Sequence, residues 1–506
     1  MSAKLLTTIV AGAALVVLGY GAGDGTVDAQ EPSFATVADS IRRYIREGAF
    51  PSAAVAVARD GKIVYQQGFG WADRERRIPA DEHTMYSLAS ISKPMTATGL
   101  MMLVEEQKVD LGAPINRYLG NAKLTSFTGD AEKATVRHVM SHMSGLPLHY
   151  EFFYEDEDHA ERAMDSAIAR YAILVNPPGD VYQYSNLGYG ILDEVIARVS
   201  GTSYPTFMRE RVFLPLDLTR TSVHIAPGLE PYVAQRYWPD GKRIPFYDFD
   251  HDGGSAVWSS AHDLVRFGMF HLDTRLPEQR EILSAATRAL MQQPLSPASG
   301  NSLGYGLGWA VANDHGRQRV SHSGGMPGVS TALHMYPEEQ VVVVVLTNQS
   351  NNRVGRIAEG LAAAAMPGYA RQRAADRESA ADTGGPADDA PFQPPASLIG
   401  TWQGMVRTYE GEVPMGLVVQ EDGDIHATVG DQPTTLVNSS SFNDATGNLT
   451  GRFMATIPTE DARRHAHTVL LNVYLRNGVL SGQASAQTAG GTPYYFALTS
   501  YVELRR

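Results

Sequence analysis

The sequence has no cysteine among its 506 residues, so the chain cannot be a lipoprotein attached through one, and its folding needs no oxidising compartment. It is also poor in basic residues. Its 42 Lys and Arg against 55 Asp and Glu give a net charge of -13. Proteins that bind nucleic acid usually carry a basic footprint, so this balance argues against that class. With 43% hydrophobic residues, the chain has ample material for packed cores and is not a disordered protein.

The amino terminus lacks a hydrophobic run long enough to span a membrane. Lys4 precedes an apolar stretch over residues 5–18, shorter than the about 20 residues of a transmembrane helix. A small and polar segment follows and ends in Val27-Asp28-Ala29. This pattern is typical of a signal peptide over residues 1–29, rather than of an uncleaved anchor. We therefore expect a periplasmic or secreted protein without a stable membrane span after cleavage.

The length exceeds the roughly 250–300 residues at which a single core stops growing, so two folded units are expected. Residues 52–65 read as a strand, a turn and a strand, and residues 341–346 form a β-branched run typical of a buried strand. Apolar residues recur at helical spacing over 96–108 and again over 356–366. Terminal segments that pair in one antiparallel sheet, with a long helical insert between them, predict an α+β domain over residues 30–367.

Beyond this domain the composition changes twice. Residues 368–395 are rich in Ala, Asp, Arg, Gly and Pro, which indicates an interdomain linker. Residues 396–506 alternate between apolar and polar, most clearly at Val469, Leu471 and Val473, and contain turns such as Asn477-Gly478. Several short strands at regular spacing predict a small all-β barrel or sandwich.

Three short motifs follow one another in the first domain, and Ser90-Ile91-Ser92-Lys93 is the first of them. A serine hydroxyl needs a nearby base before it can attack a carbonyl carbon. Because three residues make about one helical turn, Ser90 and Lys93 project from the same face of a helix. Lysine acts as a base only if burial or a neighbouring charge lowers its pKa from about 10.4.

Tyr184-Ser185-Asn186 is the second motif. The Tyr184 phenol, held near Lys93, could share or lose its proton and so relay the Ser90 proton to the leaving group. If the segment is extended, Asn186 points the same way, and its amide could hold both Lys93 and a substrate carbonyl. We expect Ser90, Lys93 and Tyr184 to be catalytic and Asn186 to bind substrate.

His322-Ser323-Gly324, followed by Gly325, is the third motif. Its glycines permit close approach of a substrate to a strand edge, so His322, Gly324 and Gly325 are expected to bind substrate. Developing negative charge needs fixed donors, and we assign the oxyanion hole to the backbone N–H groups of Ser90 and Gly325.

Each motif alone is weak evidence, because Ser-x-x-Lys, Tyr-x-Asn and His-x-Gly all occur by chance in helix starts and loops. Their joint occurrence in this order favours an acyl-transfer site. No cofactor and no metal are expected. His138 and His142 lie four apart, as metal ligands on one helix face can, but Ser144-Gly145-Leu146-Pro147 follows directly and no third ligand is apparent. A structural loop is the preferred interpretation there.

These residues resemble the class C serine β-lactamases, the related DD-carboxypeptidases and D-aminopeptidases, and the esterases that share their fold. The resemblance runs from about Phe50 to Pro367. It includes residues 86–93, 136–147 and 305–309, and the pair Gly253-Gly254. The segment starting at Leu398-Ile399-Gly400-Thr401-Trp402 is similar to the lipocalin-like barrels appended to some of these peptidases.

The resemblance implies a transpeptidase-like fold, an acyl-enzyme on Ser90, Lys93 and Tyr184 as proton carriers, and substrate binding by the strand of His322. One departure matters: lactamases of this class usually have Lys-Thr-Gly where this chain has His322-Ser323-Gly324. Lysine attracts a substrate carboxylate with a fixed charge, whereas histidine is largely neutral at pH 7.

We therefore predict a serine hydrolase that cleaves amide or ester bonds of small peptides, of the D-amino type, or of acyl compounds. The alternatives are a penicillin-binding or sensor protein that acylates with little turnover, and a β-lactamase proper. The sequence leaves open which substrate is used, what the barrel does, and the oligomeric state.

Overall fold

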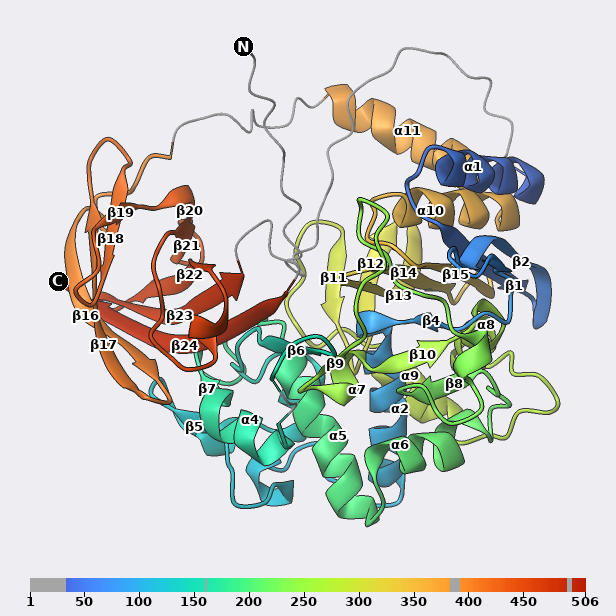
Figure 1. Cartoon of the computed structure of the whole chain (residues 1–506), viewed down its shortest axis with the longest axis horizontal. Helices are drawn as coiled ribbons and strands as arrows, with labels where there is room; N and C mark the ends of the chain where they lie inside the picture. Colours follow the sequence, from blue (N-terminus) through green and yellow to red (C-terminus); the bar gives the residue numbers. More distant parts are fainter. Residues whose placement is uncertain (1–32, 160–161, 383–391, 489–493) are drawn as a thin grey trace.

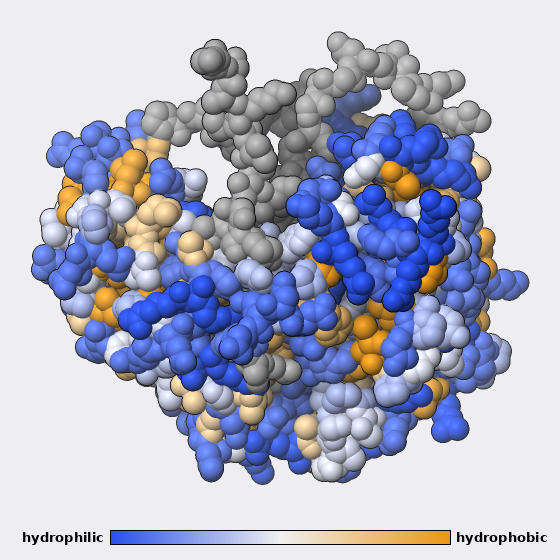
Figure 2. All heavy atoms as spheres, in the orientation of Figure 1, coloured by the Kyte–Doolittle hydropathy of each residue, from blue (hydrophilic) through white to orange (hydrophobic). Residues whose placement is uncertain are grey.

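The computed structural model describes residues 33–159, 162–382, 392–488 and 494–506. The expected signal peptide lies outside these ranges. In Figure 1 an α+β domain occupies the right and lower parts of the view, and an all-β domain in orange and red lies at the left. Within the described ranges, no helix is long and apolar enough to cross a membrane. Figure 2 shows that this face is mostly hydrophilic, with apolar side chains in small patches.

The α+β domain is built on an eight-stranded antiparallel sheet in the order β11-β12-β13-β14-β15-β1-β2-β3. The amino-terminal strand β1 pairs directly with the carboxyl-terminal strand β15, with Val57 opposite Val343. The prediction that terminal segments share one antiparallel sheet is therefore confirmed. The strands are β1 (Ser52–Arg59), β2 (Lys62–Asp73), β3 (Ile78–Pro79), β11 (Ser302–Tyr305), β12 (Ala310–Asp314), β13 (Arg317–Met326), β14 (Val329–Tyr336) and β15 (Val341–Thr347).

Strand β15 is buried on both faces, as its continuous β-branched sequence predicts. Val341, Val343 and Val345 face the core beneath α1 (Phe34–Arg46) and α10 (Val354–Ala365). Val342, Val344 and Leu346 face the opposite core, on which α8 (Ala261–His271) packs. The sheet is thus a middle layer between two layers of helices.

The helical part is inserted between β3 and β11. Its central helix α2 is buried along almost its whole length. The helices are α2 (Ser92–Glu105), α3 (Val136–Met140), α4 (Met164–Tyr171), α5 (Asn186–Ser200), α6 (Tyr204–Phe207), α7 (Asp252–Ser255) and α9 (Ala285–Met291). Small sheets accompany them: β4 (Tyr86–Ser87), β10 (Val257–Ser259) and β8 (Thr221–Val223) form one, and β5 (Thr125–Ser126) and β7 (Ile173–Leu174) another.

The carboxyl-terminal domain is a nearly closed antiparallel barrel in the strand order β19-β18-β17-β16-β24-β23-β22-β21-β20. Its alternating pattern places Trp402 in the core, where the indole N–H donates to the Leu398 carbonyl at 2.8 Å. The strands are β16 (Gly400–Thr408), β17 (Gly411–Val419), β18 (Ile425–Val429), β19 (Thr435–Leu436), β20 (Asn438–Asn443), β21 (Asn448–Phe453), β22 (His467–Arg476), β23 (Val479–Thr488) and β24 (Phe496–Arg505).

The segment expected as a linker contains regular structure. Its first part forms helix α11 (Tyr369–Asp382). Tyr369 is fully buried and donates a hydrogen bond to Asp314 at 3.0 Å, so this helix begins docked against the α+β domain. Residues 383–391 lie outside the described ranges.

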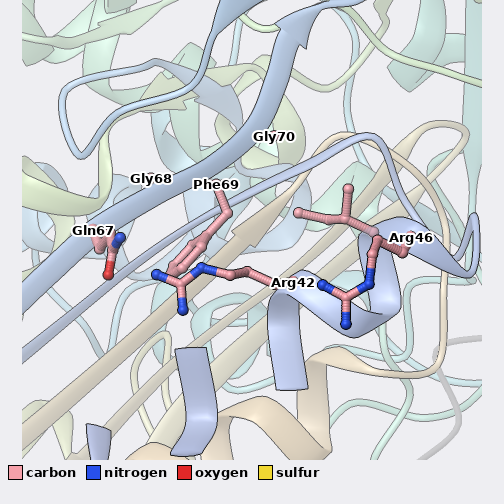
Figure 3. A pocket seen from close by; sticks show the side chains of 7 residues that line it. Arg42, Arg46, Gln67, Gly68, Phe69 and Gly70 are labelled. Carbon is pink, nitrogen blue, oxygen red and sulfur yellow. The ribbon is translucent and has the colours of Figure 1, made fainter. Parts of the chain in front are cut away.

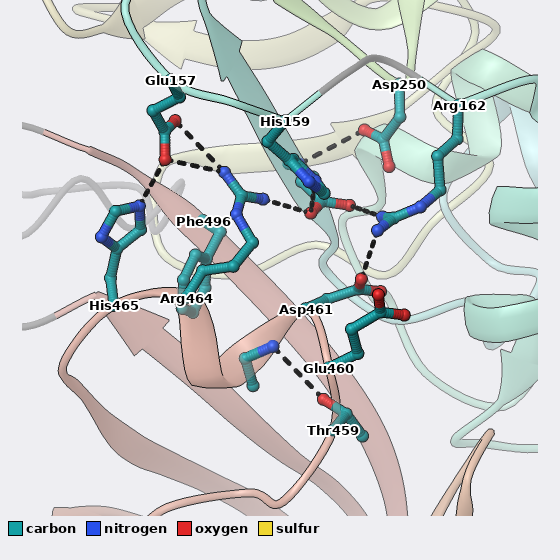
Figure 4. Close-up of polar contacts among 12 residues, drawn as sticks. Glu157, His159, Arg162, Asp250, Thr459, Glu460, Asp461, Arg464, His465 and Phe496 are labelled. Carbon is teal, nitrogen blue, oxygen red and sulfur yellow. Dashed lines mark hydrogen bonds and ion pairs between the residues drawn. The ribbon is translucent and has the colours of Figure 1, made fainter.

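The two domains share a β-ladder and a buried ionic network (Figure 4). Strand β6 (Tyr150–Tyr154) pairs with β24 of the barrel on one side and with β9 (Tyr247–Phe249) on the other. The carboxylate of Glu151 accepts hydrogen bonds from Arg162 at 2.9 Å and from Arg464 of the barrel at 2.6 Å. Asp461 of the barrel accepts from Arg170 at 2.9 Å and from Tyr171. The barrel is therefore joined to the α+β domain by buried charges.

Candidate active site

Ser90 lies in a short 3₁₀ helix, η1 (Ala89–Ile91), which leads directly into α2. The junction is strained, because Ala89 has a φ of +48°. It is also anchored, since Leu88 N–H donates to the Val257 carbonyl at 2.9 Å and Val257 N–H donates to Ser92 Oγ at 3.0 Å. Strand β10 thereby fixes the segment that presents Ser90, whose side chain stays partly exposed.

Lys93 is fully buried, with an exposed fraction of 0%. Its Nζ lies 3.2 Å from Ser90 Oγ, 2.8 Å from Asn186 Oδ1 and 2.9 Å from the Gly254 carbonyl oxygen. These acceptors match the three protons of an ammonium group. None of them carries a negative charge, and burial lowers the pKa of Lys93 well below its usual value. Lys93 therefore reaches the neutral amine form, which a general base requires, at a lower pH than an exposed lysine does.

Tyr184 faces both groups. Lys93 Nζ lies 4.9 Å from the centroid of the phenol ring. Burial raises the pKa of Tyr184, and a hydrogen bond to the Ser90 side chain opposes this shift only in part. The phenol therefore keeps its proton. Because the environment lowers the pKa of Lys93 and raises that of Tyr184, Lys93 suits the role of base and Tyr184 the role of acid.

Asn186 is the first residue of helix α5, so the extended segment on which its predicted orientation depended is not present at this residue. Ser185 is the N-cap of α5, and its Oγ accepts the Gly188 N–H at 3.0 Å. The Asn186 side chain still reaches Lys93 with its oxygen, so its NH₂ group points away from the lysine.

His322 is buried, with an exposed fraction of 6%. Its Nδ1 lies 2.8 Å from the Ser323 carbonyl oxygen, which can only accept, so Nδ1 carries the proton. In the neutral ring Nε2 then accepts from the Tyr305 hydroxyl at 3.0 Å. Burial, with a smaller contribution from Lys93, lowers the pKa of His322 to about 3. The ring is uncharged, and both its nitrogens already bond to protein groups, so direct contact with substrate requires one of these bonds to break.

The two glycines after Ser323 serve different purposes. A Cβ on Gly324 would lie 2.1 Å from the Leu88 carbonyl oxygen and 3.1 Å from Ala89 Cβ. Gly324 therefore allows β13 to approach the segment that carries Ser90, and its contact with substrate stays a prediction. A Cβ on Gly325 would meet open space.

Several residues at the site had no role in the sequence-based prediction. The carbonyl of Gly254 accepts from Lys93, Tyr305 bonds to His322, and the ring of His142 lies against Tyr184 with a centroid distance of 4.3 Å. All three belong to segments that carried the family resemblance, and that was the only available signal for them.

No group of three or more His, Cys, Asp or Glu residues suited to a metal occurs in the ranges that the structure describes. Figure 3 shows a pocket between α1 and β2. It lies away from Ser90, because η1 contacts β13 and three strands separate β13 from β2. Its Arg42 donates to Asp39 at 2.8 Å and stacks on Phe69 at 5.5 Å from the ring centroid, so it serves local packing.

A helical part inserted into an antiparallel sheet, with a Ser-x-x-Lys segment where the two meet, defines the β-lactamase/transpeptidase-like class of folds. The Beta-lactamase family model matches residues 37–366, and the chain belongs to this family of serine hydrolases. It is 30% identical over 329 residues to penicillin-binding protein 4* of Bacillus subtilis (strain 168), covering 59% of this chain and 68% of that protein. It is 23% identical over 328 residues to protein flp of Staphylococcus aureus (strain COL), covering 63% of this chain and 64% of that protein, which is less than two thirds of its length.

Solved structures share the fold. The crystal structure of SurE superposes with a TM-score of 0.61 at 22% identity, covering 92% of this chain and 98% of that one. A class C β-lactamase gives a TM-score of 0.56 at 17% identity, covering 65% of this chain and 95% of that one. The similarity to SurE therefore extends into the barrel domain, whereas the lactamase covers a smaller share of the chain.

Proposed function

We propose that this protein is an exported serine hydrolase that forms an acyl-enzyme on Ser90 and releases it to water. Its substrates are amide or ester bonds of small peptides, of the D-amino type, or of acyl compounds. The observation that carries this proposal is the 3.2 Å contact between Ser90 Oγ and Nζ of a fully buried lysine. Membership of a serine hydrolase family supports it.

In the proposed reaction, Ser90 Oγ attacks the substrate carbonyl carbon while the neutral amine of Lys93 takes the hydroxyl proton. The oxyanion accepts hydrogen bonds from the N–H groups of Ser90 and Gly325. Tyr184 gives its proton to the leaving nitrogen or oxygen as the bond to the carbonyl carbon breaks, and Lys93 returns a proton to Tyr184. Water then attacks the acyl-enzyme by the reverse sequence of proton transfers, which frees the acid and restores Ser90.

Because the His322 ring is neutral, it provides no positive charge for a substrate carboxylate. This favours small peptides and esters over substrates whose binding requires such a charge. A positively charged lysine at this position would favour free acids, whereas an uncharged imidazole gives no such preference. We expect similar kcat/KM values for substrates that differ only in a free or amidated carboxyl terminus. A preference of tenfold or more for the free acid would contradict this reading of His322.

A second candidate is a protein that is acylated by penicillins with little turnover, or a β-lactamase proper. The name of the Bacillus relative and the family of the matched region favour it. Time courses separate the candidates: a stoichiometric burst without a steady state indicates a binder, and steady hydrolysis of a chromogenic cephalosporin indicates a lactamase.

The nucleophile is tested with a fluorescent fluorophosphonate, a chromogenic ester and a D-amino acid anilide. We expect Ser90→Ala to abolish both labelling and hydrolysis. Ser87→Ala is the matched control, because Ser87 is buried three residues earlier and its Oγ has no hydrogen-bond partner among the described residues. Hydrolysis that survives Ser90→Ala shows that the nucleophile is misassigned.

Export and the nature of the barrel belong to the same proposal. The sequence pattern before Ala29 supports cleavage there, which amino-terminal sequencing of the mature protein tests.

The Trp402 position in the barrel core supports a lipocalin-like module. A fluorescent fatty acid that does not bind the full-length protein would argue against a lipocalin-type ligand site.

A further inference from the structure

The segment that carries Tyr184 is held on both sides by one residue, His142. The Gln183 N–H donates to the His142 carbonyl oxygen at 2.8 Å. The Ser185 N–H donates to Nδ1 of the His142 ring at 3.2 Å. The ring itself lies against the Tyr184 phenol, with centroids 4.3 Å apart and planes inclined by 37°. Both backbone amides that flank Tyr184 therefore depend on the same histidine.

The loop of His142 is itself rigidly placed. His142 has a φ of +58°, in the left-handed region that non-glycine residues rarely adopt. Three residues later, a Cβ on Gly145 would lie 1.9 Å from the Asn176 carbonyl oxygen, so the loop touches the segment that leads to Tyr184. The Gly179 N–H continues this docking with a bond to the Met143 carbonyl at 2.7 Å. Strain of this kind persists only where the surroundings fix it.

Packing alone does not explain a histidine here. Because Nδ1 accepts the Ser185 N–H, the neutral ring carries its proton on Nε2. Nε2 is buried, and within the described ranges it has no hydrogen-bond partner. Burial is the main reason that the pKa of His142 lies well below its usual value, so the ring stays neutral. An unpaired buried N–H costs free energy that a phenylalanine would avoid, but phenylalanine offers no acceptor to Ser185.

We propose that His142 is a positioning residue for Tyr184: it fixes the backbone on both sides of this tyrosine and limits the swing of the phenol, so that the hydroxyl stays at Ser90. The inference rests on the proposed function, in which Tyr184 protonates the leaving group. His142 then acts on the rate of that step through Tyr184, without touching the reacting atoms.

Two substitutions separate the contributions of the ring and its acceptor atom. His142→Asn keeps an acceptor near the Nδ1 position and loses the ring, whereas His142→Phe keeps a ring and loses the acceptor. We expect each to lower kcat for a D-amino acid anilide by about tenfold, a part of what general acid catalysis supplies, with little change in KM. The loss should be smaller for a p-nitrophenyl ester, whose leaving group needs no proton. His138→Gln is the control, because His138 lies four positions earlier and bonds to the Lys133 carbonyl at 3.0 Å instead.

A double-mutant cycle with Tyr184→Phe tests whether His142 acts through the Tyr184 hydroxyl. If His142 acts through Tyr184, His142→Phe causes no further loss of anilide hydrolysis once the tyrosine hydroxyl is gone. Losses that multiply in the double variant, or equal losses for anilide and ester, overturn the inference. Circular dichroism and Ser90 labelling by the fluorophosphonate verify folding, and the cycle uses His142→Asn if His142→Phe does not fold. If the losses multiply in the double variant while Ser90→Ala is inactive, only the role of His142 is wrong. If Ser90→Ala remains active, the proposed function itself is wrong.

Discussion

The Nζ of Lys93 lies 2.8 Å from Oδ1 of Asn186, a neutral acceptor 93 positions further along the chain. A carboxylate at this place would favour the ammonium form of Lys93, whereas an amide orients the group without adding charge. The contact therefore positions Lys93 while leaving it able to lose a proton.

Asn186→Asp tests this relationship through the pH dependence. A new negative charge beside Lys93 raises the pKa of the ammonium group, so a smaller fraction of the amine is neutral at any given pH. Activity depends on the neutral form and falls as the pH drops through that pKa. We expect the acidic limb of the kcat/KM profile to move to higher pH by one unit or more. The exposed Asn301→Asp is the control, and a limb that does not move would mean that another group controls it.

Tyr184→Phe tests the role of the phenol as a proton donor. An amine is a poor leaving group without a proton, so we expect anilide hydrolysis to fall by about 10²–10⁴-fold. A p-nitrophenyl ester should lose much less, because its phenolate leaves unaided. Tyr182→Phe changes a more exposed phenol two residues earlier in the same segment and is the matched control. Equal losses for both substrates would assign Tyr184 to another step.

The sequence predicts those parts of the site that depend on residue type and local spacing. Ser90 and Lys93 are one turn apart, and this separation determines their contact whatever the exact boundary of the helix. The buried strand over residues 341–346 and the pairing of the first and last strands of the α+β domain in one sheet also follow from hydrophobic pattern and domain topology.

Other features could not be predicted, because they depend on tertiary contacts of backbone atoms. The Gly254 carbonyl that accepts from Lys93 has no side-chain signal. The predicted orientation of Asn186 depended on an extended segment, whereas capping by Ser185 starts a helix there. The close approach of β13 and the Ser90 segment at Gly324 likewise forms only in the folded chain.

The two adjacent glycines offer a paired test of this packing. Gly324→Ala would place a Cβ 2.1 Å from the Leu88 carbonyl oxygen, so either β13 or the Ser90 segment must move. We expect Gly324→Ala to lower the thermal midpoint and to slow Ser90 labelling by at least tenfold, because a shift of about 1 Å disrupts catalytic alignment. Gly325→Ala keeps its backbone N–H and meets open space, so it should retain the wild-type midpoint. Similar behaviour of the two variants would contradict the close approach described here.

The ionic network at the domain boundary predicts that the barrel contributes to the stability of the whole chain. Although burial favours the neutral acid, hydrogen bonds from Tyr171 and Arg170 hold the pKa of Asp461 below its usual value. Asp461→Asn removes the charge and leaves two arginines, Arg162 and Arg170, beside a neutral amide. Breaking a buried ion pair typically costs about 3–5 kcal/mol, and we expect a loss of this size in the free energy of unfolding measured by urea denaturation.

The neighbouring Glu460 provides the control for this substitution. Its carboxylate is 75% exposed and lies 3.8 Å from Arg170, so Glu460→Gln should change the free energy of unfolding by less than about 1 kcal/mol. Because β24 and β9 both pair with β6, weakening this boundary in Asp461→Asn should also separate the unfolding of the barrel from that of the α+β domain. A single transition at the wild-type urea concentration would show that the network adds nothing to the stability of either domain.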